Sequence, residues 1–171
     1  MRGRMQPSRS SGLPRSNSRL DVEIERTKAV GTLRMAHDFA RAGELFHTHY
    51  PDTIAAPPFY LYCHAIELSL KSLLIARGTS ERQLRRIGHD LDAGLEAAVS
   101  QGLGEVAALS AEEQAAIRVM NRYYRGKELE YLVTGFKSYP SLDLLRSCAT
   151  KLVSVIKPYL RTQLARRPTS C

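Results

Sequence analysis

The segment from Pro57 to Gly78, PPFYLYCHAIELSLKSLLIARG, restricts the possible folds more than any other part of the chain. Its apolar residues recur at helical spacings of three and four. They form two stripes, which are Phe59, Cys63, Ile66, Leu70 and Leu73, and Leu61, Ala65, Leu68, Ser72 and Ile75. A narrower polar line separates the stripes and consists of Tyr60, His64, Glu67 and Lys71. Because a helix that is apolar on most of its circumference needs partners on several sides, the segment predicts the central helix of a bundle.

The same segment is long enough to cross a membrane, so its polar line has to be weighed against that alternative. His64, Glu67 and Lys71 would lie near the middle of the bilayer, where ionisable side chains are costly. We therefore expect a buried helix of a soluble protein and no membrane partner. The three cysteines are widely spaced and contain no CxxC pair, which argues against a cysteine zinc site. We predict that Cys63 and Cys148 are core residues and that the protein is cytoplasmic.

The net charge of +8 is concentrated at the two ends of the chain. Residues 1–20 carry five arginines and residues 157–171 carry four basic residues, and neither segment contains an acid. Between them, sixteen basic residues stand against seventeen acidic ones, so the body is nearly neutral. We assign residues 1–20 to a disordered basic tail, 21–160 to the folded body and 161–171 to a basic C-terminal tail. The charge argument supports at most salt-sensitive contact with nucleic acid through the tails, and solvated tails are the simpler interpretation.

Capping residues and helix breakers divide the rest of the body into further helices. Capping boxes are predicted at Ser80 with Gln83 and at Ser110 with Glu113, and Asp90 is placed to begin a helix. The predicted helices besides the central one cover residues 21–49, a short piece from 80, and residues 90–102, 110–125 and 141–159.

The segment from Lys127 to Pro140 has a different pattern. Leu129, Tyr131 and Val133 alternate with polar residues, which predicts a short extended segment that could form one arm of a small hairpin. The fold class is therefore all-α: an up-and-down bundle of four main helices with short helical pieces and room for one small β-hairpin.

Three segments in this order resemble the HEPN superfamily, a group of small helical domains found in prokaryotic toxin, defence and nucleotidyltransferase-associated proteins. They are AIELSLKSLLIARG (Ala65–Gly78), IGHDL (Ile87–Leu91) and NRYYRGKELEYLVTG (Asn121–Gly135). The resemblance extends from about residue 21 to residue 156. It implies a helical bundle, frequent homodimers and a role related to RNA, nucleotides or a cognate partner protein in a toxin–antitoxin or defence system, and no cofactor.

Catalytic HEPN proteins are metal-independent endoribonucleases with an arginine, four to six residues and then a histidine late in the fold. Histidine can exchange a proton near neutral pH, and arginine can stabilise the charged transition state. This chain has no histidine after His89, and the spacing occurs only earlier, at Arg82 with His89 and at Arg41 with His47. We therefore expect a non-catalytic binding module. The alternatives are an endoribonuclease that uses Arg82 and His89, and a helical adaptor with no nucleic-acid role.

The polar line of the central helix and the later Tyr–Arg run are the candidate binding residues. One interpretation is an internal polar seam that locks helix packing, in which Asp90 caps a helix and His89 bonds nearby groups. The other is a pocket in which arginine and tyrosine hold a phosphate and stack a base. The candidates are His64, Glu67, Lys71, His89, Asp90, Arg122, Tyr123, Tyr124, Arg125 and Lys127.

His37, His47 and His49 are the remaining histidines of the chain. The spacing of two between His47 and His49 does not place both rings on one helix face, so we predict no metal site there.

Overall fold

A computed structural model gives the fold of the protein and describes residues 19–50, 56–131 and 133–165. The helices in these residues are α1 (Arg19–His49), α2 (Ala56–Ala76), α3 (Glu81–Ile87), α4 (Leu91–Ser100), α5 (Leu103–Val106), α6 (Ala111–Arg125) and α7 (Leu142–Ala165). The all-α prediction is confirmed for the part of the chain that the structure describes. Most of the predicted tail at residues 1–20, and residues 166–171, lie outside the described residues, whereas residues 161–165 belong to α7.

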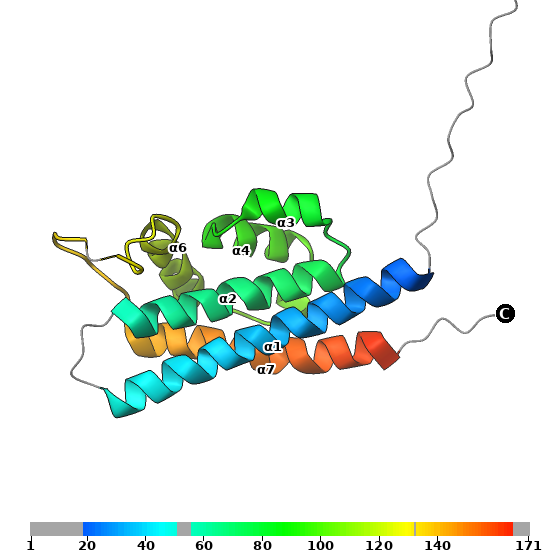
Figure 1. The fold of residues 1–171 in the computed structure, drawn as a ribbon, viewed down its shortest axis with the longest axis horizontal. Helices are drawn as coiled ribbons and strands as arrows, with labels where there is room; N and C mark the ends of the chain where they lie inside the picture. Colours follow the sequence, from blue (N-terminus) through cyan, green and yellow to red (C-terminus); the bar gives the residue numbers. More distant parts are fainter. Residues whose placement is uncertain (1–18, 51–55, 132, 166–171) are drawn as a thin grey trace, which may run out of the picture.

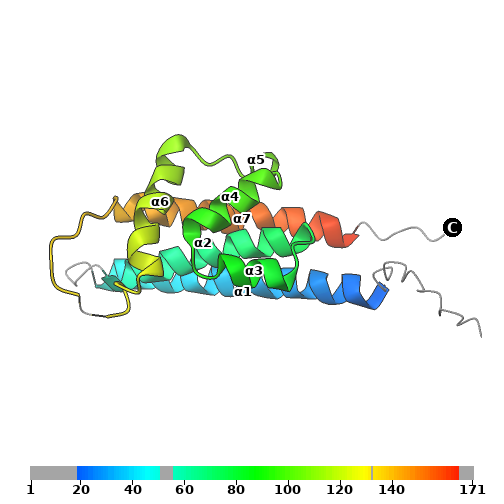
Figure 2. The ribbon, with the colours of Figure 1, turned by 90° about the horizontal axis from the view of Figure 1, so that it is seen from above.

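The long helix α2 lies between two groups of helices. Helices α1 and α7 lie on one side of α2, and α3, α4 and α6 lie on the other (Figure 1). Seen from above, α6 runs across the long helices, and the first turn of α1 and the last turn of α7 lie at the same end of the molecule (Figure 2). The predicted central helix thus contacts α1, α4, α6 and α7.

The core follows the first apolar stripe of α2 most closely. Thirteen of the 21 residues in α2 are buried, including all five residues of the first stripe, whereas Leu61 and Leu68 of the second stripe are only partly buried. Cys63 and Cys148 are both buried free thiols, as predicted. Burial raises the pKa of the Cys63 thiol above its usual range and that of Cys148 to about 12, so both sulfurs remain protonated and inert.

Helices α1 and α2 approach each other closely because small residues lie between them. A Cβ atom on Gly43 would lie 2.8 Å from Cε1 of Tyr62, whose ring is fully buried. Further along the same contact, the hydroxyl of Ser72 donates a hydrogen bond of 2.8 Å to the carbonyl of Ala29. The pair of helices is therefore fixed by a steric fit at one end and by a buried hydrogen bond at the other.

The predicted helix ends are also found. Both capping boxes form, at Ser80 with Gln83 and at Ser110 with Glu113. Gly78 follows α2 with a φ of 87°, and the next amide, of Thr79, donates to the carbonyl of Leu74 at 2.9 Å. This six-to-one bond and the positive φ terminate the helix in the way that favours glycine.

The prediction of a short extended segment after α6 was wrong. No strand occurs among the described residues between Lys127 and Pro140. The amides of Lys127 and Glu128 bond back to the last turn of α6, and no neighbouring strand offers a ladder to the alternating residues.

Helix α7 continues through Pro158 for seven residues and so extends beyond residue 159, where the sequence predicted its end. Helix α2 has the length and apolar character of a membrane span, but most of that span is buried inside the protein. Burial of this kind is what the core helix of a soluble protein shows.

Candidate functional site

A single carboxylate joins three segments that are far apart in the sequence. Glu67 is 5% exposed and lies on the polar line of α2. Its Oε1 accepts a hydrogen bond of 2.5 Å from Nζ of Lys71, one helical turn further on. Its Oε2 accepts a hydrogen bond of 2.5 Å from the hydroxyl of Tyr124 on α6 and lies 3.1 Å from Nδ1 of His89, between α3 and α4. We call these four residues and His64 the Glu67 cluster.

The cluster keeps Glu67 ionised at neutral pH. Burial alone would raise the pKa of this carboxyl, but the nearby imidazole of His64 and the hydrogen bonds from Lys71 and Tyr124 outweigh burial and lower the pKa to about 2. Burial and the adjacent Glu67 carboxylate raise the pKa of the Tyr124 hydroxyl. The charged acceptor and the neutral phenol donor therefore stabilise each other, as in other charge-assisted hydrogen bonds.

His64 belongs to an aromatic layer against the cluster. Its Nδ1 lies 2.6 Å from the hydroxyl oxygen of Tyr124 and 3.4 Å from Oε2 of Glu67. Since the only hydroxyl hydrogen of Tyr124 is directed to Glu67, we assign the proton to Nδ1 of His64, which then donates to the tyrosine oxygen. The imidazole ring stacks on Tyr60 at 5.8 Å and meets the ring of Phe39 edge-on at 4.3 Å. His64 is thus held by packing as well as by hydrogen bonding.

His89 reaches the same carboxylate from the surface. Its side chain is 65% exposed, and only Nδ1 has a hydrogen-bond partner among the described residues. A neutral imidazole that donates Nδ1–H to Glu67 carries its lone pair on Nε2. This nitrogen can accept a proton or a hydrogen bond from a molecule in solution.

Asp90 fixes the turn that carries His89. Its Oδ1 caps α4 by accepting from the amide of Ala93 at 3.0 Å and from Nδ2 of Asn121 at 2.9 Å, and its Oδ2 accepts from Arg125 at 2.8 Å. Burial raises the pKa of Asp90, but the hydrogen bonds from Ala93 and Asn121 and the charge of Arg125 together lower it. Because Asn121 also accepts from the amide of Leu91 at 2.8 Å, the turn is bound to α6 at two positions.

The outer rim of this arrangement presents two basic side chains. His89 is 65% exposed and Arg125 is 68% exposed, and both are anchored from behind, by Glu67 and by Asp90. His89 and Arg125 are linked through the consecutive residues His89 and Asp90, and we call these two exposed side chains the His89–Arg125 edge. Its inner side is closed by hydrogen bonds, and its outer side is open to solvent.

Four of the predicted site residues do not join this network. The guanidinium of Arg122 lies over the ring of Tyr123, 5.7 Å from its centre. Tyr123 donates from its hydroxyl to the carbonyl of Ser138, away from Glu67. Lys127 is exposed in the turn after α6 with a φ of 59°. Arg82 is exposed on α3 and has no hydrogen bond or ion pair within the described part of the chain.

Sequence reasoning missed Asn121, which binds both Asp90 and the amide of Leu91. Its position three residues before Tyr124 and four before Arg125 puts it on the same face of α6. That spacing was a usable signal.

The three remaining histidines have separate neighbours. Nδ1 of His37 lies 3.5 Å from Asp38, Nε2 of His47 lies 3.8 Å from Asp143, and Nδ1 of His49 lies 2.9 Å from the carbonyl of Leu45. In the residues that the structure describes, no three His, Cys, Asp or Glu side chains come together in a way that could hold a metal ion.

The geometry supports two kinds of chemistry at this site. The His89–Arg125 edge can bind an anion through a guanidinium and an imidazole, and the Glu67–His89 pair can move a proton through Nε2. Comparison of the chain with protein-family models, with curated proteins and with solved structures found no match.

Proposed function

We propose that the protein is a cytoplasmic HEPN-like binding module that recognises RNA or a nucleotide through the His89–Arg125 edge, without catalysis. The observation that carries this proposal concerns the three segments that resemble HEPN proteins. Ala65–Gly78 supplies Glu67, Ile87–Leu91 supplies His89, and Asn121–Gly135 supplies Tyr124 and Arg125. The convergence of the three segments supports one shared binding site, because features that served only local packing would not need to meet at the same place.

The His89–Arg125 edge suits a phosphate because Arg125 can exchange its ion-pair partner Asp90 for a phosphate at a low cost in free energy. The ion pair between Arg125 and Asp90 is largely exposed on the arginine side, and pairs of this kind contribute roughly 0–1 kcal/mol. Arginine binds phosphate oxygens through two parallel N–H donors, and a nearby imidazole adds a third donor when it is protonated. A phosphate can therefore contact the guanidinium while Asp90 continues to cap α4.

Exposed aromatic side chains follow α6 and favour a nucleic acid over a simple phosphate ester. Tyr131 is 67% exposed and Phe136 is fully exposed in the segment between α6 and α7. Unpaired bases stack on aromatic rings of this kind, with roughly 1–3 kcal/mol for each base. Single-stranded RNA is accordingly the preferred ligand of the proposal, in a toxin–antitoxin or defence context, and we propose a homodimer with the up-and-down four-helix arrangement of HEPN domains.

The test is binding of a short single-stranded RNA by fluorescence anisotropy at several salt concentrations. Arg125→Ala is expected to weaken binding on the order of tenfold and to lower the salt slope by about one. Arg86→Ala is the matched control, since Arg86 is an exposed arginine of α3 that forms no ion pair with any residue the structure describes. Equal affinity of Arg125→Ala and wild type would contradict the proposal.

A second experiment tests whether the folded body binds RNA without the ends of the chain. If a variant without residues 1–18 and 166–171 loses all binding, the RNA-binding element is the tails and the proposal fails. If no RNA or nucleotide binds to any form, the adaptor alternative is favoured, and co-purification of a stable protein partner would support it.

An endoribonuclease is the second candidate, and the Glu67–His89 pair favours it. A buried carboxylate that holds Nδ1 of an exposed imidazole leaves Nε2 as a general base for a 2′-hydroxyl. The spacing between Arg82 and His89 in the sequence favours Arg82 as the arginine that stabilises the transition state. The hydrogen bonds around Asp90 favour Arg125 instead. Cleavage of structured RNA that survives EDTA and is lost in His89→Ala would establish catalysis, and Arg82→Ala against Arg125→Ala would identify the arginine.

A further inference from the structure

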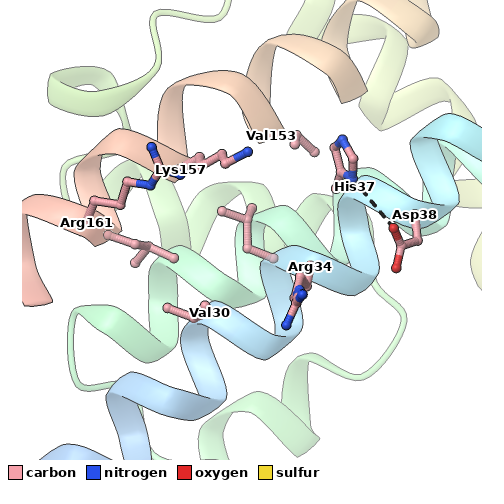
Figure 3. Close-up of a pocket in the computed structure, with 9 residues that line it drawn as sticks. Val30, Arg34, His37, Asp38, Val153, Lys157 and Arg161 are labelled. Atoms are coloured by element: carbon pink, nitrogen blue, oxygen red, sulfur yellow. Dashed lines mark ion pairs between the residues drawn. The ribbon is translucent and has the colours of Figure 1, made fainter.

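A groove between α1 and α7 carries side chains that the proposed RNA site does not use. It has a volume of about 510 Å³ and is lined by Val30, Leu33, Arg34, His37, Asp38, Val153, Lys157, Leu160 and Arg161. Figure 3 shows Arg34, His37 and Asp38 on one helix and Lys157 and Arg161 on the other. Since α1 and α7 lie on the opposite side of α2 from α4 and α6 (Figure 1), the groove is separate from the His89–Arg125 edge.

The charges of the groove are unbalanced. Arg34, Lys157 and Arg161 have no hydrogen bond or ion pair within the described residues, and the only carboxylate of the lining is Asp38. Asp38 lies 3.5 Å from Nδ1 of His37, on the same helix. By contrast, Lys151, one and a half turns before Lys157 on α7, is paired with Glu113. Three unpaired cations around one hollow create a positive potential that favours an anion.

The base of the groove is aliphatic. Leu33, Val153 and Leu160 are nearly buried and Val30 is partly buried, and the only ring among the lining residues is the imidazole of His37. The lining covers eight residue steps on each helix, a length of about 12 Å. A nucleobase would have only this small imidazole on which to stack, whereas an alkyl chain needs only apolar contact along the aliphatic base.

The terminal segments of this chain do not fit as occupants, although the first turn of α1 and the last turn of α7 lie at the same end of the molecule (Figure 2). Residues 1–18 and 166–171 contain arginines and no acid, so they would be repelled by Lys157 and Arg161.

We propose that the groove binds a free amphipathic anion, an aliphatic chain with one phosphate or carboxylate headgroup. The chain lies along Leu33, Val153 and Leu160, and the headgroup contacts Lys157 and Arg161. The volume lies within the range of about 300–1,000 Å³ that is usual for small-molecule sites. This proposal does not depend on the proposed RNA-binding function.

The test is isothermal titration of the full chain with decyl phosphate at concentrations below micelle formation. Lys157→Glu and Arg161→Glu are each expected to weaken binding on the order of tenfold or more, because each removes a charge-assisted contact. Arg86→Glu reverses the charge of an exposed arginine on α3 that has no ion pair in the described part of the chain; it is the matched control and should keep the wild-type affinity. Circular dichroism verifies that each variant is folded, and both groove cations are exposed, so their reversal does not disturb the core.

Ligand variants test the two parts of the proposal separately. Decyltrimethylammonium and inorganic phosphate should bind at least tenfold more weakly than decyl phosphate, because the first carries the opposite charge and the second lacks the alkyl chain. Equal binding of either compound, unchanged affinity in both groove variants, or binding to phosphatidylglycerol vesicles without binding of monomeric decyl phosphate would overturn the proposal.

Discussion

Replacement of Glu67 by glutamine tests whether one ionised carboxylate holds the three converging segments together. Glu67→Gln keeps the size of the side chain and removes its charge. The pKa of this carboxyl falls from its usual value of 4.5 to about 2 on folding. A depression of that size corresponds to about 3 kcal/mol of the free energy of unfolding at pH 7. We therefore expect Glu67→Gln to be less stable than wild type by about 3 kcal/mol at pH 7.

The pH dependence distinguishes this cause from a general loss of packing. A carboxyl whose pKa is lowered in the folded state contributes its full stabilisation above pH 4.5 and loses it as the pH falls toward 2. The contribution decreases to roughly 1.4 kcal/mol at pH 3, so the difference between wild type and variant should shrink accordingly. Urea unfolding followed by circular dichroism at pH 7, 5, 4 and 3 measures this difference directly.

Glu96→Gln is the control, because Glu96 is exposed on α4 and has no ion pair within the described residues. It should change the free energy of unfolding by less than about 0.5 kcal/mol. A difference between wild type and Glu67→Gln that stays constant from pH 7 to pH 3 would refute the reasoning. Such a result would show that the cost comes from packing and not from the charge.

Three further substitutions test neighbouring contacts by the same unfolding assay. Gly43→Ala should destabilise the protein by about 1–3 kcal/mol, because its methyl group would lie 2.8 Å from the buried Tyr62 ring; a stabilised variant would contradict that fit. Gly31 lies on the same helix, and a Cβ atom added there would have nothing within 4 Å, so Gly31→Ala should stabilise the protein by up to about 1 kcal/mol. A loss of stability would show that the added methyl group meets another part of the protein. Tyr124→Phe should cost about 1–3 kcal/mol by removing a hydrogen bond to the charged Glu67, whereas a neutral effect would mean that this bond contributes nothing.

Much of the fold could be predicted because it depends on local patterns. The first apolar stripe of α2, the two capping boxes and Gly78 each act through residues within a few positions, and each is found as expected. The Lys127–Pro140 segment was mispredicted because strand formation depends on a neighbour. Alternating residues form a hydrogen-bond ladder only beside another strand. Here the amides of Lys127 and Glu128 donate to carbonyls in the last turn of α6 instead.

The candidate site could be predicted only in part, for a related reason. Glu67 and Lys71 are one turn apart, so their pairing follows from the sequence. Tyr124 contacts Glu67, whereas the neighbouring Tyr123 contacts Ser138. This difference depends on the rotation of α6 about its own axis. The rotation is set by the packing of α6 on α4 and α7, which no pattern within the helix specifies.

Pro158 divides α7 into two parts with different resistance to local opening. Because proline has no N–H, the carbonyl of Ser154 lacks its helical donor, and the turns after Pro158 are joined to the rest by one bond fewer. Those turns carry Leu160 and Arg161, which form the C-terminal part of the α7 wall of the groove. We expect their amides to exchange with deuterium faster than those of the preceding turns. This part of the wall can therefore shift with the occupant of the groove while the core contacts around Leu152 stay in place.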